Sequence, residues 1–328
     1  MLNKNVLRCL VVLTPCLLML SCSSGRRLYR VYRESGAGFV NAQGNFVIPA
    51  KYNDADNFSD GRALVVSGNT GGWLNARGRL SIPAMYPSAG VFSEGRAMAL
   101  SPKTREAGYL NKWGAWVIQP RWQKAGDFSE GLASVTDSGG GAYINRRGKI
   151  VFRHTFSSAG KFIDGRALVS RNGQYGFINR RGREVIKVKF PYAQNFSEGR
   201  AVFADPETQK CGFINRRGKV VIPAVYDFAD SFRNDRALFV QNGKAGFLDH
   251  GGREIIPPVF SWADHFSEGL AAAESGGLIG YINTQGRWKI EPRYLSAEAF
   301  RNGRALVKDG EEVIMINSRG REITIRDR

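Results

Sequence analysis

The side chains able to do metal or acid–base chemistry in this sequence are few and scattered. The three histidines, His154, His250 and His265, fall at different positions of different sequence units. None has a cysteine or a second histidine at the spacing that zinc sites use, so we expect no metal site and interpret these histidines as surface or partly buried side chains. Cys211 stands in a strand position held elsewhere by Ala, Gly, Tyr or Ile, and we interpret it as a small hydrophobe rather than a nucleophile.

The recurring carboxylates belong to a Ser-Glu-Gly tripeptide and its relatives. They include Glu94, Glu130, Glu198 and Glu268. Glycosidases need two carboxylates held at a defined separation, whereas a glutamate repeated at one position of each unit suits turn or cap chemistry better. The sequence also has no phosphate loop of the Gly-x-x-x-x-Gly-Lys-Ser/Thr type. We therefore expect no cofactor and no enzymatic activity, with an enzyme acting on cell-wall glycan as an alternative.

The strongest chemical signal is positive charge, with a formal net charge of +18 and a pI of about 10.0. Much of it lies in Arg-Arg pairs at equivalent places in successive units. These pairs form the candidate binding ridge: Arg146, Arg147, Arg180, Arg181, Arg216 and Arg217. Such a field favours anionic partners. Another interpretation is that the pairs are solvated turn tips that keep the chain soluble.

Nucleic acid is not an expected partner. Proteins that bind nucleic acid combine basic residues with exposed aromatic side chains on which the bases stack. Here the aromatics recur at strictly periodic positions, which is typical of a core.

The N-terminus has the features of an export signal. Lys4 and Arg8 precede an apolar run over residues 10–20 that is too short for a comfortable transmembrane helix. The sequence Leu18-Met-Leu-Ser-Cys22 resembles the lipobox of bacterial lipoproteins, in which the cysteine is lipidated and becomes the mature N-terminus. Ser23 after the cysteine resembles lipoproteins sorted to the outer membrane. We expect a signal peptide over 1–21, lipid on Cys22, a tether over 22–27 and a repeat array over 28–328.

The elements that carry these residues repeat about every 34 residues, with two intervals of 36. Each unit opens with Gly and an aromatic residue, followed by Asn-x-x-Gly and a short apolar run. The aromatics are Phe39, Trp73, Tyr109, Tyr143, Phe177, Phe213, Phe247 and Tyr281, and Met315 opens a partial ninth unit. Asn and Gly suit the first and last positions of a tight turn, so we predict a β-hairpin.

The second half of each unit reads aromatic-x-x-Ala-x-x-Phe, then Ser-Glu-Gly and a third apolar run. The spacing of three predicts a turn of α- or 3₁₀-helix with aromatic, Ala and Phe on one face. Gly fills the third place of the tripeptide in seven of eight copies and Asp235 fills it in the other, which indicates a left-handed backbone conformation. We expect the aromatic ladder to be the main source of stability.

Taken together, this composite pattern resembles the WG-containing repeat family of bacterial proteins over about residues 28–328. The family's Trp-Gly pair lacks its Trp here. Its position holds Ala37, Gly71, Ala107, Gly141, Tyr175, Cys211, Ala245 and Ile279. The resemblance implies an all-β repeat domain on an exported or envelope protein, and implies no activity.

Two arrangements satisfy such units: an open superhelical array in which each unit touches only its neighbours, and a closed β-propeller. We favour the open array of eight to nine units, because propeller blades need four strands and the unit shows three short strands and a helical turn. The expected function is a non-enzymatic, lipid-anchored scaffold in the cell envelope, at the outer membrane facing the periplasm or the cell surface. Its expected partner is an envelope protein or an anionic glycan such as peptidoglycan or lipopolysaccharide; a purely structural envelope component is the second alternative.

Overall fold

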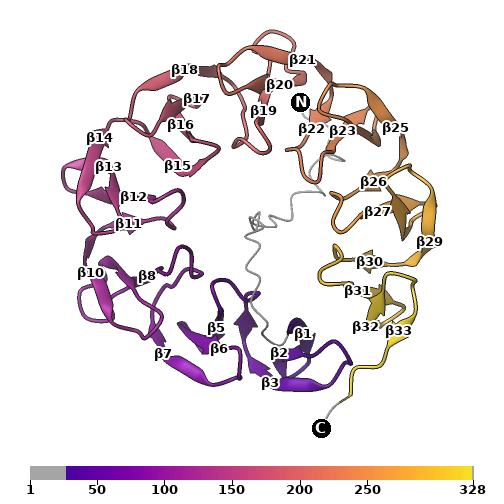
Figure 1. Ribbon diagram of the computed structural model, residues 1–328, viewed down its shortest axis with the longest axis horizontal. Helices are drawn as coiled ribbons and strands as arrows, with labels where there is room; N and C mark the ends of the chain where they lie inside the picture. The colour runs from indigo at the N-terminus through magenta and orange to yellow at the C-terminus, as the bar shows by residue number, and fades with distance from the viewer. Residues whose placement is uncertain (1–26, 327–328) are drawn as a thin grey trace.

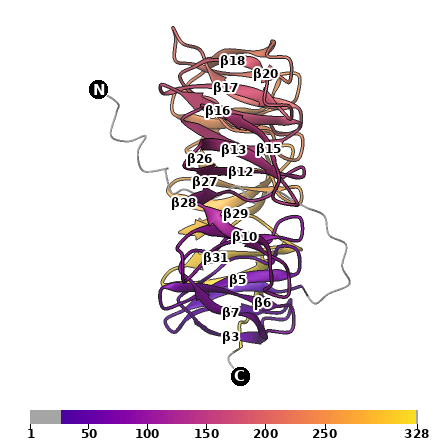
Figure 2. The same cartoon turned by 90° about the vertical axis from the view of Figure 1, so that its left-hand side faces the viewer.

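The computed structural model describes residues 27–326, and these form a closed ring of nine small antiparallel sheets (Figure 1). Seen edge-on, the ring is a flat disc (Figure 2). The predicted signal peptide, Cys22 and all but the last residue of the tether lie outside the described residues. Within residues 27–326 no helix is long and apolar enough to cross a membrane.

Each sheet is one blade, and we number the blades along the chain. Blade 1 consists of β1 (Tyr29–Arg33), β2 (Gly36–Val40) and β3 (Phe46–Tyr52). Blade 2 consists of β4 (Asp54–Ala55), β5 (Arg62–Ser67), β6 (Thr70–Asn75) and β7 (Leu80–Tyr86). Blade 3 consists of β8 (Ala97–Leu100), β9 (Ala107–Leu110) and β10 (Trp116–Trp122). Blade 4 consists of β11 (Lys124–Ala125), β12 (Leu132–Asp137), β13 (Gly140–Asn145) and β14 (Ile150–His154). Blade 5 consists of β15 (Ser158–Ile163), β16 (Arg166–Arg171), β17 (Gln174–Asn179) and β18 (Glu184–Phe190). Blade 6 consists of β19 (Arg200–Ala204), β20 (Cys211–Asn215) and β21 (Val220–Tyr226). Blade 7 consists of β22 (Phe228–Ala229), β23 (Ala237–Gln241), β24 (Lys244–Leu248) and β25 (Glu254–Phe260). Blade 8 consists of β26 (Trp262–Ala263), β27 (Leu270–Ser275), β28 (Leu278–Asn283) and β29 (Trp288–Tyr294). Blade 9 consists of β30 (Ser296–Ala297), β31 (Arg304–Asp309), β32 (Glu312–Asn317) and β33 (Glu322–Ile323).

The prediction of an all-β repeat protein is confirmed, and the ring is the closed propeller rather than the favoured open array. The predicted helical turn is wrong. The stretch around the recurring Ala is extended, and in six blades it forms the first strand, such as β4 or β11. In blades 3 and 6 the same stretch makes a single bridge, Ala89 with Ala99 and Ala193 with Phe203. This short innermost strand is the fourth strand whose apparent absence had argued against a propeller.

The sequence unit and the blade are out of phase. A unit that opens with the Gly-aromatic pair supplies the last two strands of one blade and the first two strands of the next. The N-terminal strand β1 and the C-terminal strands β32 and β33 are therefore the half-units that complete blades 1 and 9. Eight whole units and two halves build nine blades, and every whole unit ties two blades together.

Aromatic pairs fill the junctions between blades. Each ring of a Gly-aromatic pair packs on the Phe that opens the next Ser-Glu-Gly turn, with centroids 4.7–5.6 Å apart. The pairs are Phe39–Phe58, Trp73–Phe92, Tyr109–Phe128, Tyr143–Phe162, Phe177–Phe196, Phe213–Phe232, Phe247–Phe266 and Tyr281–Phe300. All but Phe58 are buried. The predicted aromatic ladder therefore exists, but it runs around a ring.

The seam between blades 9 and 1 repeats contacts made at ordinary junctions. Arg62 donates to the carbonyl of Lys112 in the next blade at 2.8 Å, and Arg304 donates in the same way to the carbonyl of Ala42 at 3.3 Å. The hydroxyl of Tyr29 also donates to the carbonyl of Asn302 across the seam at 2.9 Å. The ring closes because its first and last half-units meet like any two neighbours.

Candidate functional site: a basic arc and a histidine–carboxylate cluster

Two sets of turns share one face of the ring. Within a blade successive strands are antiparallel, so the turn between the first and second strands and the turn between the third and fourth strands emerge on the same side. The former contains the Ser-Glu-Gly tripeptide and the latter the Asn-x-x-Gly tetrapeptide. We call this side the turn face.

The Ser-Glu-Gly turns bind one another around the ring. Glu94 and Gly95 both have positive φ, 51° and 76°. This conformation lets the Glu94 carboxylate accept the N–H of Gly131 in the next blade, at 3.1 Å to each oxygen. Ser93 donates its hydroxyl to the carbonyl of Phe128 at 2.7 Å. The recurring carboxylates thus link adjacent blades by accepting backbone N–H groups of the next turn. The same bond is made by Asp60, Glu130, Asp164, Glu198 and Glu268.

The Asn-x-x-Gly turns form as predicted. Asn145 Oδ1 accepts the N–H groups of Arg147 at 2.9 Å and Lys149 at 3.1 Å, and Gly148 has a φ of 78°. The same geometry recurs at Asn179 and Asn215. These turns carry the predicted ridge, which we call the basic arc: Arg146, Arg147, Arg180, Arg181, Arg216 and Arg217, all exposed, in blades 4, 5 and 6.

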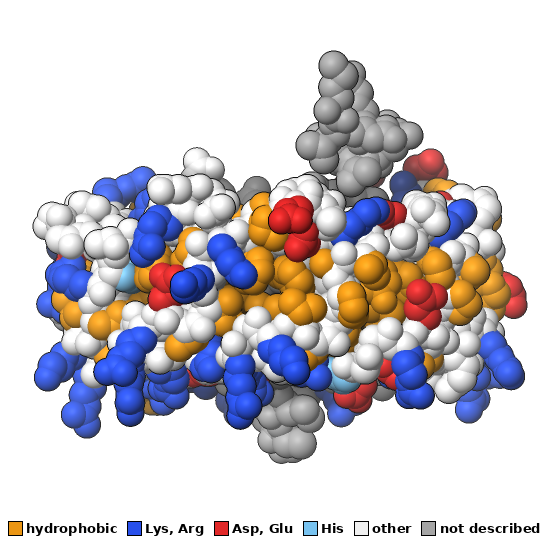
Figure 3. Space-filling model, turned by 90° about the horizontal axis from the view of Figure 1, so that it is seen from above, with side chains coloured by type: hydrophobic (Ala, Val, Ile, Leu, Met, Phe, Trp, Pro, Cys, Tyr) orange, Lys and Arg blue, Asp and Glu red, His pale blue; other side chains and the backbone are white. Residues whose placement is uncertain are grey.

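The basic arc is divided into two kinds of arginine. The first of each pair leans onto the preceding blade: Arg146 donates to the carbonyl of Glu94 at 2.7 Å, and Arg216 lies 3.8 Å from the carboxylate of Asp164. Arg180 makes the same bond to the carbonyl of Glu130, at 2.6 Å. The second arginines, Arg147, Arg181 and Arg217, form no side-chain hydrogen bond or ion pair with the described residues. Figure 3 shows Lys and Arg side chains in a row along one edge of the ring.

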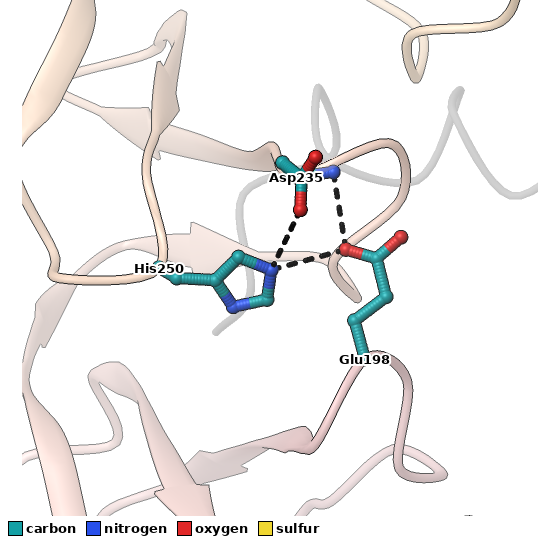
Figure 4. A group of neighbouring side chains, drawn as sticks. All are labelled: Glu198, Asp235 and His250. Carbon is teal, nitrogen blue, oxygen red and sulfur yellow. Dashed lines mark hydrogen bonds and ion pairs between the residues drawn. The ribbon is translucent and has the colours of Figure 1, made fainter.

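Blade 7 interrupts this pattern with a histidine–carboxylate cluster. His250 Nε2 lies 3.1 Å from Glu198 Oε2 and 3.5 Å from Asp235 Oδ1 (Figure 4). Glu198 comes from the Ser-Glu-Gly turn of blade 6, Asp235 from the equivalent turn of blade 7, and His250 from the turn between β24 and β25. Their ligand atoms all lie within 4.8 Å of one another, so these three side chains are able to hold a metal ion.

Two members of the cluster depart from the residues found at the same positions of neighbouring units. Asp235 stands where the other turns have Gly and keeps their left-handed backbone, with a φ of 61°. His250 stands in the place of Arg146, Arg180 and Arg216. Sequence reasoning treated His250 as an isolated side chain and did not pair it with Asp235. The signal was present, because two departures from the repeat fall 15 residues apart, in consecutive units that share blade 7.

The other two histidines do not join a comparable group. His265 is buried and bonds Asp230 across blades 7 and 8 at 2.7 Å. Burial raises the pKa of Asp230, but the bond and charge of His265 outweigh it and leave that pKa below its usual range. His154 has no hydrogen-bond partner within residues 27–326 at either buried ring nitrogen, and burial lowers its pKa. Cys211 is a buried thiol whose pKa is raised by burial, as expected of a small hydrophobe.

The fold and these sites define a nine-bladed β-propeller with an interlocked turn face. The chain belongs to the WG-containing repeat family, whose repeat matches residues 38–70, 72–100, 108–139, 142–175, 175–204, 212–244, 246–278 and 279–312. The family's missing Trp would stand in the third strand of each blade, where the buried residues Ala37 and Cys211 face the last aromatic of the fourth strand.

Comparison with other proteins adds the fold alone. No curated protein sequence matches the chain. A solved structure of a eukaryotic initiation factor is similar with a TM-score of 0.65 at 11% identity, over 91% of this chain and 95% of that one. PorZ, described as an essential bacterial surface component of the type-IX secretion system of Porphyromonas gingivalis, matches at 9% identity over 81% of this chain and 45% of that one, with a TM-score of 0.36. Kluyveromyces lactis Hsv2p matches at 8% identity over 66% of this chain and 86% of that one, with a TM-score of 0.42.

Proposed function

We propose that this protein is a non-enzymatic, lipid-anchored scaffold of the cell envelope whose turn face binds an anionic envelope glycan. The observation that supports this most directly is the basic arc. Three successive blades present equivalent exposed arginines on one side of the ring, and Arg147, Arg181 and Arg217 have guanidinium groups free of protein partners among the described residues.

Arginine suits such a ligand because its planar guanidinium binds phosphate or carboxylate groups through two parallel hydrogen bonds. Lipopolysaccharide carries phosphates and peptidoglycan carries carboxylates. A polymer of repeating anionic groups would be matched by a row of arginines repeating from blade to blade. Because these arginines are exposed, salt should weaken the interaction strongly.

The lipid anchor belongs to the same proposal. Acylation of Cys22, after cleavage of the signal peptide 1–21, would hold the ring at a membrane through a short tether. An anchor in the outer membrane would bring the ring near peptidoglycan if it faces the periplasm, or near lipopolysaccharide if it faces the cell surface. A single bound envelope protein is the competing partner, and a purely structural role is the remaining alternative.

The test is capture by the purified full chain of isolated peptidoglycan, lipopolysaccharide and a whole-envelope extract, each at low and at high salt. The proposal predicts capture of one of the two glycans at low salt and its loss at high salt. Capture of one protein at both salts would replace the glycan with a protein partner. Absence of capture in every arm would leave the structural role.

A further inference from the structure

The histidine–carboxylate cluster has the chemistry of a site that the basic arc does not use. We propose that Glu198, Asp235 and His250 bind one divalent transition-metal ion of the Zn²⁺ class, which bridges blades 6 and 7. Imidazole nitrogen and carboxylate oxygen are both ligands that such ions accept. The inference is independent of the scaffold function and of the basic arc.

The distances fit one ion. A tetrahedral metal about 2.0–2.2 Å from its nitrogen and oxygen ligands holds those ligands about 3.3–3.6 Å apart. His250 Nε2 already lies 3.1 Å from Glu198 Oε2 and 3.5 Å from Asp235 Oδ1. An ion could therefore enter with small shifts of the side chains. Asp235 is 83% exposed, so a fourth position would remain open to water.

Two of the three ligands are held in place by the surrounding turns. The Glu198 carboxylate accepts the N–H groups of Asn234 at 2.8 Å and Asp235 at 3.1 Å. The His250 ring stacks on Phe232 with centroids 4.2 Å apart and an interplanar angle of 12°. Fixed ligands of this kind lose little freedom when an ion binds, which favours affinity.

The other blades explain what the ion would replace. At two other junctions a guanidinium pairs with the acid of the preceding blade: Arg146 lies 3.8 Å from Glu94, and Arg216 lies 3.8 Å from Asp164. Blade 7 has the imidazole of His250 in that place and adds a second carboxylate, Asp235. A divalent ion would balance the charges of the two carboxylates.

The repeat itself supplies a matched control. The double variant D235G/H250R introduces the Gly that the other Ser-Glu-Gly turns have and the Arg that blades 4, 5 and 6 have, so it should keep the fold while removing two ligands. We would titrate Zn²⁺ alone into the full chain and into this variant and measure stoichiometry by calorimetry and Tm with and without EDTA. His154, His265 and all cysteines are present in both proteins, so their contributions cancel.

The proposal predicts that the wild-type chain binds one equivalent of Zn²⁺ more than the variant. It also predicts a Tm that rises with Zn²⁺ in the wild type alone and falls back with EDTA, because an ion bound only to the folded state stabilises it. Equal stoichiometry and equal Tm response in the two proteins would overturn it. If the double variant fails to fold by circular dichroism, Glu198→Gln and His250→Arg, made singly, give the same two readouts.

Discussion

At the scale of single residues, the most exceptional side chain is His154. Both of its ring nitrogens are buried and have no hydrogen-bond partner in the part of the chain that the structure describes. The ring lies beside Gly141, which occupies the position of the family's Trp. The imidazole is packed between Tyr143 and Phe156. The ring therefore packs as an apolar side chain would, and protonating it in this position would cost free energy.

The pKa of His154 makes that cost measurable. Burial lowers the folded-state pKa below the unfolded value of about 6.5. The unfolded chain therefore binds the proton more readily, and stability falls as the pH drops below that unfolded value. We expect the variant His154→Leu to lose less of its stability to urea unfolding between pH 7 and pH 5 than the wild type loses. Equal losses in the two proteins would show that His154 is not the group responsible.

The sequence was enough to identify the unusual residues of the cluster, but it did not show that these residues lie close together. Glu198, Asp235 and His250 are separated by up to 52 residues, and only the offset between units and blades brings them together. Asp235 was correctly predicted to have a left-handed backbone from the tolerance of Asp for that conformation. Its carboxylate was not assigned a neighbour, because a single unit does not contain the junction.

At the scale of elements, the packing at blade junctions depends on the Phe that opens each Ser-Glu-Gly turn. Phe128 is buried against Tyr109, with centroids 4.7 Å apart. Truncation to Ala should cost about 3–5 kcal/mol, because it removes a ring and leaves a cavity between blades. The measurement is the free energy of unfolding in urea.

A suitable control for Phe128→Ala is Trp113→Ala. Trp113 is a larger aromatic that is 83% exposed on the turn face, and its removal should change stability by about 0.5 kcal/mol or less. A comparable loss in the two variants would mean that the junctions do not carry the stability of the ring.

The periodic aromatics were assigned correctly from the sequence, whereas the conformation between them was not. A spacing of three from aromatic to Ala to Phe fits a helical turn, and it also fits a two-residue strand followed by a loop, as in β4 and the turn after it. Local spacing does not separate these, because the deciding interactions are hydrogen bonds to the next strand. Asp54 and Ala55 pair with Val66 and Val65, about ten residues later in the chain.

At the scale of the whole molecule, closure depends on contacts between the two ends of the described chain. The carbonyl of Gly44 accepts the N–H of Arg326 at 3.0 Å. A Cβ placed on Gly44 would lie 2.2 Å from the carbonyl oxygen of Thr324. A side chain at this position would therefore push the C-terminal segment away from blade 1.

Gly44→Ala should loosen the seam. Gly61→Ala is the matched control, since Gly61 has a similar φ, 75° against 81°, and a Cβ there meets nothing within 4 Å. Each variant should lose about 1–2 kcal/mol from backbone strain. Only Gly44→Ala should also speed hydrogen exchange in β32 and β33. Equal exchange in the two variants would contradict the assignment of the seam.

Closure was the part of the fold that the unit could not reveal. The sequence of one repeat is the same whether the array is open or closed, and the difference lies in how the terminal half-units complete blades 1 and 9. The basic arc was predictable as a set of equivalent turn residues, because equivalent positions of stacked units lie side by side in either arrangement. Its division into blade-bound and free arginines required the three-dimensional contacts.

The central claim is that the basic arc binds an anionic envelope glycan, and a charge-matched pair of variants tests it most directly. One variant replaces the free arginines Arg147, Arg181 and Arg217 with Ser. The other replaces Arg287, Arg319 and Arg321 with Ser, and these arginines are also exposed, on blades 8 and 9. Both lower the net charge by three and should leave Tm unchanged. The measurement is the affinity of each full chain for lipopolysaccharide and for peptidoglycan at low salt.

We predict that the first variant loses at least tenfold in affinity for the glycan that the wild type captures, while the second stays close to the wild type. Such a loss corresponds to about 1.4 kcal/mol, which is small for three charged hydrogen-bonded contacts. Equal weakening of the two variants would show that net charge alone attracts the ligand. Unchanged affinity in both would remove the turn face from binding.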